Sequence, residues 1–353
     1  MEFQENIPLS ALTTFKIGGP ARYFIRAVTA EDVIDASAFA KEKGVPFFAV
    51  GAGSNLLASD NGFAGLIIKI EIPGVSFEER ATEVLITAGA GERWDAFVDA
   101  TVKRGLYGLE NLSGIPGSVG GAPVQNIGAY GAEAKDTIVS VDTIDSETGA
   151  PRRFSNAECR FGYRDSFFKT ADGKRYIITA VTFALKKNGK LNLEYRDLKN
   201  YFARSGAAKA TLANVREAVL EIRRGKFPDL AIYGTAGSFF KNPIITKKQF
   251  DELKKRFPDM PGFPAVADSR ISDVGRRGQQ EEAVKIPLAW ILDNILHYKG
   301  VAAGEVGSFK AQPLVLVSRG EGRAADVRRF ADDLAAKVLK ATGIAIEREV
   351  ECF

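Results

Sequence analysis

"GLENLSGIPGSVGGAPVQNIGAYGAE", residues 108–133, is a long glycine-rich stretch without a repeat period. It is longer than most connections between secondary-structure elements, and such loops often carry function. Glycine lets the backbone turn tightly and approach a ligand closely. The amides of Gln125 and Asn126 suit a ring that carries both hydrogen-bond donors and acceptors. A well-packed structural loop without a ligand is the alternative interpretation.

A second glycine turn, "GAGSNLL" at 51–57, follows a predicted strand at 45–50. It is not a dinucleotide fingerprint, because Leu56 replaces the third glycine and turn-forming residues follow in place of a helix. Consecutive N–H groups can still form an anion-binding nest, to which Ser54 and Asn55 add polar side chains. A turn without a ligand is the alternative. Together, the two loops predict one extended ligand between neighbouring domains.

Strands and helices alternate along the rest of the chain, which predicts a mixed α/β (α+β), multi-domain protein. A β-α-β unit opens it, with Thr29 and Asp32 as a capping box at the start of its helix. The predicted strands are 21–27, 45–50, 83–89, 138–145, 176–185 and 344–353, and the predicted helices are 30–44, 92–105, 212–225 and 325–343. The expected domains are 1–72, 73–221 and 222–353, and the C-terminal strand is expected to return to the first two.

The composition of the 353 residues is that of a globular protein, with 45% hydrophobic and 26% charged residues. A net charge of +4, spread along the chain, argues against a nucleic-acid partner. The chain contains no apolar run of about 18 residues and no signal peptide is expected, so we expect no membrane association and a cytoplasmic location. Cys159, Cys352 and the lone His297 cannot form a Cys/His zinc site, so we expect no metal.

Six motifs in family order give the chain a specific resemblance. They are "TTFKIGGPA" (13–21), "GAGSNLL", the stretch at 108–133, "FGYRDSFFK" (161–169), "AGSFFKNP" (236–243) and "IEREV" (346–350). The chain resembles the UDP-N-acetylenolpyruvoylglucosamine reductases, flavoenzymes of bacterial cell-wall precursor synthesis. The segment "LNLEYRDL" (191–198) resembles the longer variety of this family.

The resemblance implies a two-domain FAD-binding module of the vanillyl-alcohol-oxidase type followed by a substrate-binding domain. It implies non-covalent FAD, NADPH as co-substrate, a UDP-sugar enolpyruvyl ether as substrate and a bacterial, monomeric enzyme. The implied catalytic residues are Arg164, Ser238 and Glu349. The implied substrate contacts are Tyr163, Tyr195, Lys226, Asn242 and Asn294. The implied FAD contacts are Gly51, Ala52, Gly53, Ser54, Asn55, Leu56, Ile115, Pro116, Gly117, Gly120, Gly121, Gln125, Asn126, Gly128 and Ile178.

This chemistry explains a catalytic serine in a chain with a single histidine. Hydride addition to an alkene conjugated with a carboxylate leaves an enolate, which needs a proton donor and not an activated nucleophile. A serine hydroxyl such as that of Ser238 can supply that proton. The planar cation of Arg164 suits the substrate carboxylate as charge builds there. Glu349 can be protonated, or can orient a water molecule or the carboxylate, and the sequence leaves both open.

Other interpretations stay open on the residues alone. Ser238 can simply turn the chain, Arg164 can pair with Asp165, and Glu349 can be a solvated edge charge. Likewise, Lys226 can be a helix-terminal cation and Tyr195 a packed aromatic. The rival functions are another FAD oxidase of the same fold, a serine hydrolase, which lacks its G-x-S-x-G motif and base here, and a non-enzymatic nucleotide-binding protein.

Overall fold

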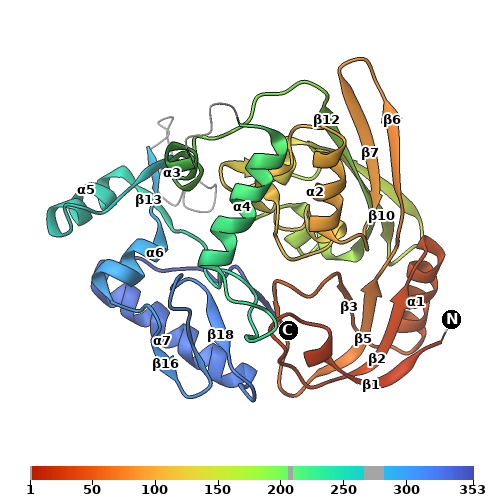
Figure 1. Cartoon of the computed structure of the whole chain (residues 1–353). Helices are drawn as coiled ribbons and strands as arrows, with labels where there is room; N and C mark the ends of the chain where they lie inside the picture. The colour runs from red at the N-terminus through yellow and green to blue at the C-terminus, as the bar shows by residue number, and fades with distance from the viewer. Residues whose placement is uncertain (1, 206–209, 266–281) are drawn as a thin grey trace, which may run out of the picture. The chain divides into compact units, whose positions relative to one another are not determined.

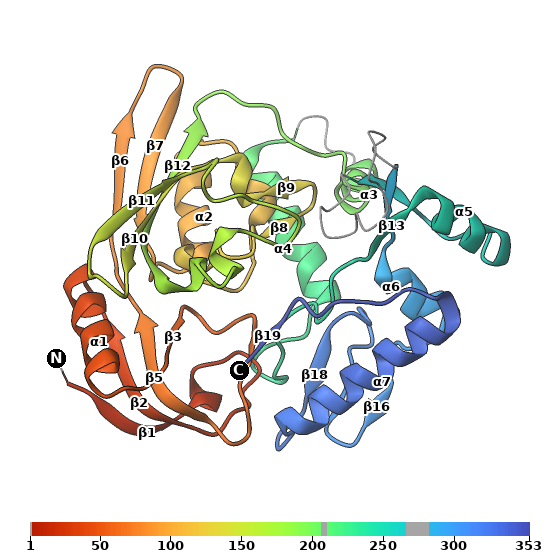
Figure 2. The same cartoon turned by 180° about the vertical axis from the view of Figure 1, so that it is seen from behind.

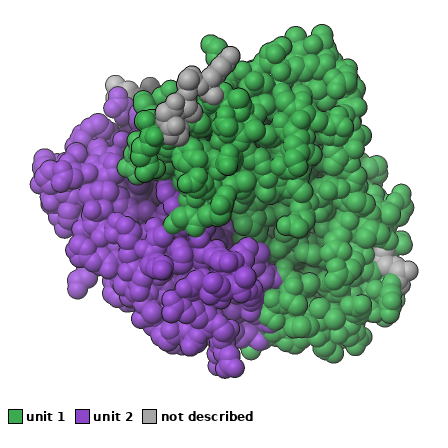
Figure 3. All heavy atoms as spheres, in the orientation of Figure 1, with its two compact units in different colours: residues 1–12, 19–54, 61–225 green, residues 13–18, 55–60, 226–353 purple. Residues whose placement is uncertain are grey.

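The computed structural model describes residues 2–205, 210–265 and 282–353. The chain forms two compact units, which Figure 3 distinguishes by colour. Unit 1 comprises residues 1–12, 19–54 and 61–225, and unit 2 comprises residues 13–18, 55–60 and 226–353. Two short segments from the N-terminal region therefore belong to the unit that the C-terminal part of the chain forms.

Unit 1 begins with a four-stranded sheet in the order β1-β2-β5-β3 (Figure 1). Its strands are β1 (Gln4–Pro8), β2 (Pro20–Ala27), β3 (Phe47–Val50) and β5 (Phe63–Ile70), and the 3₁₀ turn η1 (Leu9–Ala11) follows β1. β5 pairs in parallel with β2 and β3, whereas β1 pairs antiparallel with β2. The predicted β-α-β unit is confirmed, with the unpredicted β5 between its two strands.

Helix α1 (Ala30–Glu42) connects β2 to β3 and begins at the predicted capping box. The Asp32 N–H donates to Thr29 Oγ1 at 3.1 Å, and the Thr29 N–H donates to Asp32 Oδ2 at 2.9 Å. The two bonds satisfy backbone donors that the first helical turn leaves unpaired. The buried face of α1, with Val33 and Ala36, packs in the same core as the sheet.

The second sheet of unit 1 has five strands in the order β11-β10-β12-β7-β6, and all its neighbours are antiparallel (Figure 2). Its strands are β6 (Val75–Glu79), β7 (Glu83–Gly89), β10 (Ile138–Asp145), β11 (Pro151–Ser155) and β12 (Tyr176–Lys186). Helix α2 (Trp94–Lys103) packs Trp94 and Phe97 against Phe183 of β12, with ring centroids 6.0 and 5.1 Å away. The strands and the helix predicted in this region are confirmed.

The glycine-rich stretch 108–133 lies between α2 and β10 and consists of short turns and one small hairpin. Its elements are η2 (Glu110–Leu112), η3 (Val119–Gly121), β8 (Gly128–Ala129) and β9 (Ala132–Glu133). The 3₁₀ turn η4 (Ala134–Asp136) follows directly. The N–H groups of Val119 and Gly120 donate to the carbonyls of Glu92 and Ala90, each at 2.9 Å. The loop is therefore fastened to the segment that follows β7.

Two helices complete unit 1 around the side chain of Tyr130. They are α3 (Arg196–Ser205) and α4 (Leu212–Lys226). Earlier in the chain, the 3₁₀ turns η5 (Phe167–Lys169) and η6 (Gly173–Arg175) precede β12. Leu198 of α3 and Val215 and Val219 of α4 are buried in one cluster with Tyr130. The glycine-rich loop is thus packed against helices as well as against the sheet.

The described residues of unit 2 include two small antiparallel sheets and one long helix. Its elements are β13 (Ile244–Thr246), α5 (Lys247–Arg256), β14 (Phe263–Ala265), β15 (Ala283–Lys285), α6 (Leu288–Trp290), the π-helical turn η7 (Ile291–Ile295), β16 (Ala302–Ala303), β17 (Val306–Ser308), β18 (Leu316–Ser318) and α7 (Ala324–Thr342). The predicted helix at 325–343 is confirmed as α7, which ends at Gly343 with a φ of 73°. That left-handed conformation favours glycine.

The N-terminal segments of unit 2 contribute to its core. Phe15, Ile17 and Leu57 are buried in the same cluster as Phe239 and Phe330. In addition, the Asp60 carboxylate accepts hydrogen bonds from the N–H groups of Ala324 and Ala325 at 2.7 and 2.9 Å and so caps helix α7. The short segments 13–18 and 55–60 are therefore structural parts of this unit.

The prediction of a strand over 344–353 is wrong for most of its length. Only β19 (Glu351–Cys352) is a strand, and it pairs in parallel with β4 (Leu56–Leu57). The reason is a change of partner along the segment. The Glu349 N–H donates to Phe239 O at 2.8 Å, whereas the Glu351 N–H donates to Asn55 O at 3.0 Å. No single neighbour provides a continuous ladder.

Candidate active site

Two glycine turns of unit 1 lie side by side. A Cβ placed on Gly51 would lie 2.4 Å from Ser118 Oγ, and one on Gly117 would lie 3.5 Å from Ser54 Oγ. The residue at position 51 must therefore lack a side chain if both turns are to keep their places. The juxtaposition brings Ser54 close to Gly117, and a ligand shared by the two turns stays a prediction.

Ser118 was missed by the sequence analysis. Its side chain is buried, with 6% exposed, and among the described residues its hydroxyl has no hydrogen-bond partner. Buried hydroxyls without a partner are rare, because desolvation of such a group costs about 1–3 kcal/mol. A ligand atom beside Gly51 would satisfy it. The only sequence signal was its place in "PGSVGG", between glycines already assigned to the ligand.

The side chain of Asn126, a predicted FAD contact, forms its hydrogen bonds within the protein. It is fully buried with a φ of 45°, and its Nδ2 donates to Glu133 Oε2 at 2.9 Å and to Gly162 O at 3.0 Å. Its Oδ1 accepts from the Lys135 N–H at 3.0 Å. Both amide hydrogens are thus used within the protein, and a contact of Asn126 with a flavin stays a prediction.

The other predicted FAD contacts lie at several places. Gly51, Ala52 and Gly53 form the first turn with Ser54, whereas Asn55 and Leu56 belong to unit 2. Ile178 is buried in β12. Ile115, Pro116, Gly121, Gln125 and Gly128 lie along the glycine-rich loop. The role of each in binding stays a prediction.

Arg164 lies at the tip of a tight hairpin turn in unit 1. The Gly162 N–H donates to Asp165 O at 2.9 Å and the Asp165 N–H donates to Gly162 O at 3.4 Å, which leaves Tyr163 and Arg164 as the two turn residues. Arg164 has a φ of 53°, and its Nη2 donates to Gly128 O at 2.6 Å. The left-handed backbone costs energy for a residue other than glycine, and such strain is concentrated at functional sites.

Tyr195 completes this group of predicted site residues in unit 1. Its ring lies edge-on to Tyr130 with centroids 5.4 Å apart. Partial burial and, to a smaller extent, the Asp197 carboxylate raise the pKa of Tyr195, whereas the nearby Arg164 cation acts to lower it. Burial raises the pKa of Tyr130 to about 12. The structure thus brings together the predicted substrate contacts Tyr163 and Tyr195 and the predicted catalytic Arg164.

Ser238 and Glu349 lie in adjacent segments of unit 2. The Glu349 N–H donates to Phe239 O at 2.8 Å, and the Glu349 carbonyl accepts from Asn55 Nδ2 at 3.1 Å. Gly237, with a φ of 78°, precedes Ser238, and the buried rings of Phe239 and Phe240 anchor the segment that follows. Ser238 and Glu349 are each half-buried. The unit therefore presents a hydroxyl and a carboxyl group on neighbouring chain segments.

The remaining predicted substrate contacts, Asn242, Lys226 and Asn294, lie in three different elements. Asn242 lies in unit 2, and its Oδ1 accepts from the Leu288 N–H at 2.9 Å. Lys226 is the last residue of α4. Asn294 lies in η7 and donates to Trp290 O at 3.0 Å. Substrate contacts for all three stay predictions.

Comparison with known proteins agrees with this arrangement. Residues 21–155 match the FAD binding domain family, and residues 229–353 match the family described as UDP-N-acetylenolpyruvoylglucosamine reductase, C-terminal domain. The UDP-N-acetylenolpyruvoylglucosamine reductase of Pseudomonas aeruginosa is 39% identical over 354 residues, covering 100% of this chain and 99% of that protein. That of Bdellovibrio bacteriovorus is 38% identical over 350 residues, covering 99% of each.

The chain belongs to the UDP-N-acetylenolpyruvoylglucosamine reductase family. It is an FAD-dependent oxidoreductase, which excludes the hydrolase and the non-enzymatic alternatives. The crystal structure of the reductase from Thermus caldophilus has the same fold, with a TM-score of 0.66 at 23% identity and full coverage of both chains. The expected mixed α/β class, with an FAD-binding module followed by a substrate-binding domain, is confirmed.

The residues of unit 1 fit the cofactor of this family. The Ser118 hydroxyl, which has no hydrogen-bond partner in the described part of the chain, and the space that a Cβ on Gly51 would fill form a cradle for a polar ligand. Neighbouring backbone N–H groups in such turns favour anions, as the pyrophosphate of FAD requires. Within residues 2–205, 210–265 and 282–353, no helix combines the length and the apolar character needed to cross a membrane.

Proposed function

We propose that this protein reduces the enolpyruvyl group of UDP-N-acetylglucosamine enolpyruvate to UDP-N-acetylmuramate with NADPH, as a step of peptidoglycan precursor synthesis. The observation that carries the proposal is the 39% identity to a UDP-N-acetylenolpyruvoylglucosamine reductase along the whole chain. The chemistry that bound FAD would supply is hydride transfer from NADPH to the terminal enolpyruvyl carbon. The protein's own residues bind the substrate, stabilise the charge that develops and supply the proton.

Arg164 stabilises the developing negative charge. Addition of hydride moves electron density from the double bond into the substrate carboxylate, so a fixed cation beside that carboxylate lowers the barrier. The hairpin turn and the bond from Arg164 Nη2 to Gly128 O hold the guanidinium in place before substrate arrives. A preorganised donor does not have to reorganise during the reaction, and this position supports the role.

Ser238 donates the proton to the enolate carbon. General acid catalysis contributes about 10²–10⁴-fold when the donor is positioned correctly. The Phe239 and Phe240 rings fix the segment, so Ser238 has little freedom to move away. Glu349, on the neighbouring segment, then orients the substrate carboxylate or a water molecule that restores the serine proton.

The remaining predicted residues bind the non-reacting part of the substrate. Tyr163 and Tyr195 supply aromatic surface near Arg164, and Lys226 supplies a cation for the diphosphate. Asn242 and Asn294 supply amides. We further propose that the FAD is non-covalent and that the enzyme acts as a monomer in the bacterial cytoplasm, where UDP-sugars and NADPH occur together.

Anaerobic rapid-mixing absorbance at the flavin band tests the function. NADPH should bleach the purified yellow protein, and UDP-N-acetylglucosamine enolpyruvate should restore the colour within the turnover time, whereas UDP-N-acetylglucosamine should not. Failure of the enolpyruvyl substrate to restore the colour would refute the proposed reaction. Acid precipitation should release the flavin into the supernatant, and flavin retained in the pellet would contradict non-covalent binding.

A further inference from the structure

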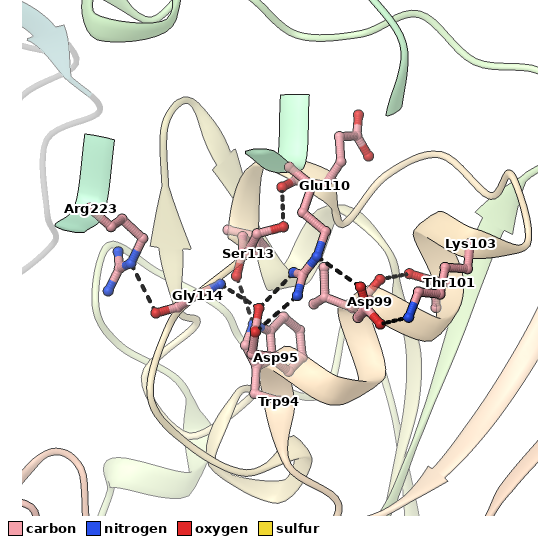
Figure 4. Close-up of polar contacts among 12 residues, drawn as sticks. Trp94, Asp95, Asp99, Thr101, Lys103, Glu110, Ser113, Gly114 and Arg223 are labelled. Carbon is pink, nitrogen blue, oxygen red and sulfur yellow. Dashed lines mark hydrogen bonds and ion pairs between the residues drawn. The ribbon is translucent and has the colours of Figure 1, made fainter. Parts of the chain in front are cut away.

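Gly114, directly before the "IPGS" turn, is held through both of its backbone polar groups by charged side chains. Its N–H donates to Asp95 Oδ1 at 2.6 Å, and its carbonyl accepts from Arg223 Nε at 2.9 Å (Figure 4). Asp95 belongs to α2 and Arg223 to α4. Two helices thus hold, like a clamp, the two peptide units on either side of the Gly114 Cα, directly before the 115–118 turn.

The Asp95 carboxylate is itself fixed by a second arginine of α4. Arg216 donates from Nη1 and Nη2 to the two Asp95 oxygens at 2.7 and 3.0 Å, and from Nε to Asp99 Oδ1 at 3.1 Å. Only 12% of the Arg216 side chain is exposed. Bidentate pairs of this kind fix geometry as well as charge. Burial acts to raise the pKa of Asp95, but the hydrogen bonds from Arg216 and from the Gly114 N–H outweigh it and lower that pKa.

The backbone around Gly114 adds a reason for the clamp. Gly114 has a φ of 70°, and a Cβ there would lie 2.8 Å from Leu220 Cδ2 and 3.1 Å from Arg223 Cδ. The neighbouring Trp94 donates from its N–H to Gly117 O at 3.1 Å and from Nε1 to Leu112 O at 2.9 Å. The first turn of α2 is therefore bonded to the loop on both sides of Ile115 and Pro116.

We propose that Asp95, fixed by Arg216, is a positioning residue that holds the 114–118 turn in its FAD-binding conformation in the protein without FAD. Its carboxylate contacts neither substrate nor reacting atoms and acts through the Gly114 peptide. A loop ordered in advance lowers the conformational cost of binding, so loss of the clamp appears as weaker FAD binding. The inference rests on the assignment of the 114–118 turn to FAD.

Asp99 offers a matched control on the same helix. Asp99 pairs with the same Arg216 and with Lys103, at 3.1 and 2.6 Å, and is the second carboxylate that Arg216 contacts. The substitutions Asp95→Asn and Asp99→Asn each remove one negative charge from α2 and one carboxylate from Arg216. Among the described contacts, only Asp95 reaches the loop.

Two measurements on these variants test the proposal. FAD fluorescence titration of the apoprotein should give a dissociation constant at least about tenfold higher for Asp95→Asn, since a neutral amide replaces the carboxylate in the bonds to the Gly114 N–H and to Arg216. That of Asp99→Asn should stay within about threefold of wild type. Hydrogen–deuterium exchange of the apoprotein should be faster in the 112–118 peptide for Asp95→Asn alone.

The possible results distinguish a role of Asp95 in positioning the 114–118 turn from a role in the stability of the whole protein. Equal rises in the dissociation constant for both variants, with equal losses of apoprotein melting temperature, would overturn the proposal. Faster exchange with unchanged FAD affinity would also overturn it, because the clamp would then order a turn that FAD does not need. The exchange measurement requires no flavin, so its result is independent of the proposed reaction.

A milder variant keeps the test available if Asp95→Asn does not fold. Arg216→Lys preserves the charge but loses the two-pronged contact with Asp95. It should raise the FAD dissociation constant by about threefold to tenfold. Affinity equal to that of wild type would refute a role for the fixed carboxylate.

Discussion

Removal of the Ser238 hydroxyl should slow one half-reaction and leave the other unchanged. The described residues offer this hydroxyl no hydrogen-bond partner, so Ser238→Ala leaves no buried protein group unpaired. The backbone bond from the Phe239 N–H to Leu314 O at 2.8 Å stays in place, as do the buried rings that follow. The free energy of unfolding should therefore change by no more than about 0.5 kcal/mol.

The catalytic effect should be much larger than the effect on stability. Loss of a general acid costs about 10²–10⁴-fold in rate, or about 2.7–5.4 kcal/mol in the barrier. No proton from Ser238 is needed when NADPH reduces the flavin. The variant should therefore bleach at nearly the wild-type rate and recover its colour at least about 100-fold more slowly on addition of enolpyruvyl substrate.

Anaerobic rapid mixing at the flavin band measures both steps in one preparation. Ser238→Cys is the matched control, because it keeps a weak proton donor of similar size and should recover part of the rate. If both half-reactions slow alike in Ser238→Ala, the side chain organises the site and does not donate the proton. If neither slows, "GSFFKNP" is only a turn, and the assignment of Ser238 is wrong.

Three further perturbations test other parts of the structure. Arg164→Lys should lower kcat/KM by at least about 100-fold at normal flavin content, because an ammonium cannot replace the planar fork; near-normal turnover would count against contact with the carboxylate. Gly51→Ala places a Cβ 2.4 Å from Ser118 Oγ and should weaken FAD binding in a fluorescence titration, whereas Gly225→Ala, with no atom within 4 Å of the new Cβ, should not. Tyr130 has a pKa raised from 10.0 to about 12, so the folded state keeps its proton where the unfolded state loses it. Tyr130 therefore contributes about 2–3 kcal/mol to the free energy of unfolding below pH 10, and this contribution should decline as the pH rises towards 12. In urea unfolding over this range, the free energy of unfolding should fall less steeply with pH for Tyr130→Phe than for wild type, where the buried Cys159 thiol also contributes to the fall. Equal slopes would refute the assignment.

Local patterns predicted the local structure correctly. The capping box of Thr29 and Asp32, the helix α7 and the strands β7, β10 and β12 were recognised from residue patterns that span only a few positions, whereas β6 and β11 were not predicted. β5, "FAGLIIKI", was missed because it lies between two parallel partners and reads as a continuous apolar run directly after a turn-rich segment. Its recognition requires knowledge of both neighbouring strands.

Long-range contacts account for what the sequence could not predict about the site. The motifs led to Arg164, Ser238 and Glu349, but nothing in them shows that Glu349 is bonded to the backbone of Phe239. The role of Ser118 beside a ligand depends on its closeness to Gly51, which is 67 positions away in the sequence (118 − 51). The strand predicted over 344–353 failed for the same reason, since this segment bonds to two different neighbours in turn.

The interlaced course of the chain has a consequence for synthesis on the ribosome. Segments 13–18 and 55–60 leave the ribosome early, yet their partners include the last residues of the chain, with the Ser59 N–H donating to Phe353 O at 2.7 Å. At about 5–20 residues per second, the ribosome needs roughly 15 to 60 s to pass from residue 60 to residue 353. During that time Phe15, Ile17 and Leu57 have no completed core to enter. The nascent chain therefore carries these apolar residues without their partners until residues 226–353 have been synthesised, and this exposed apolar surface makes it a substrate for holdase chaperones.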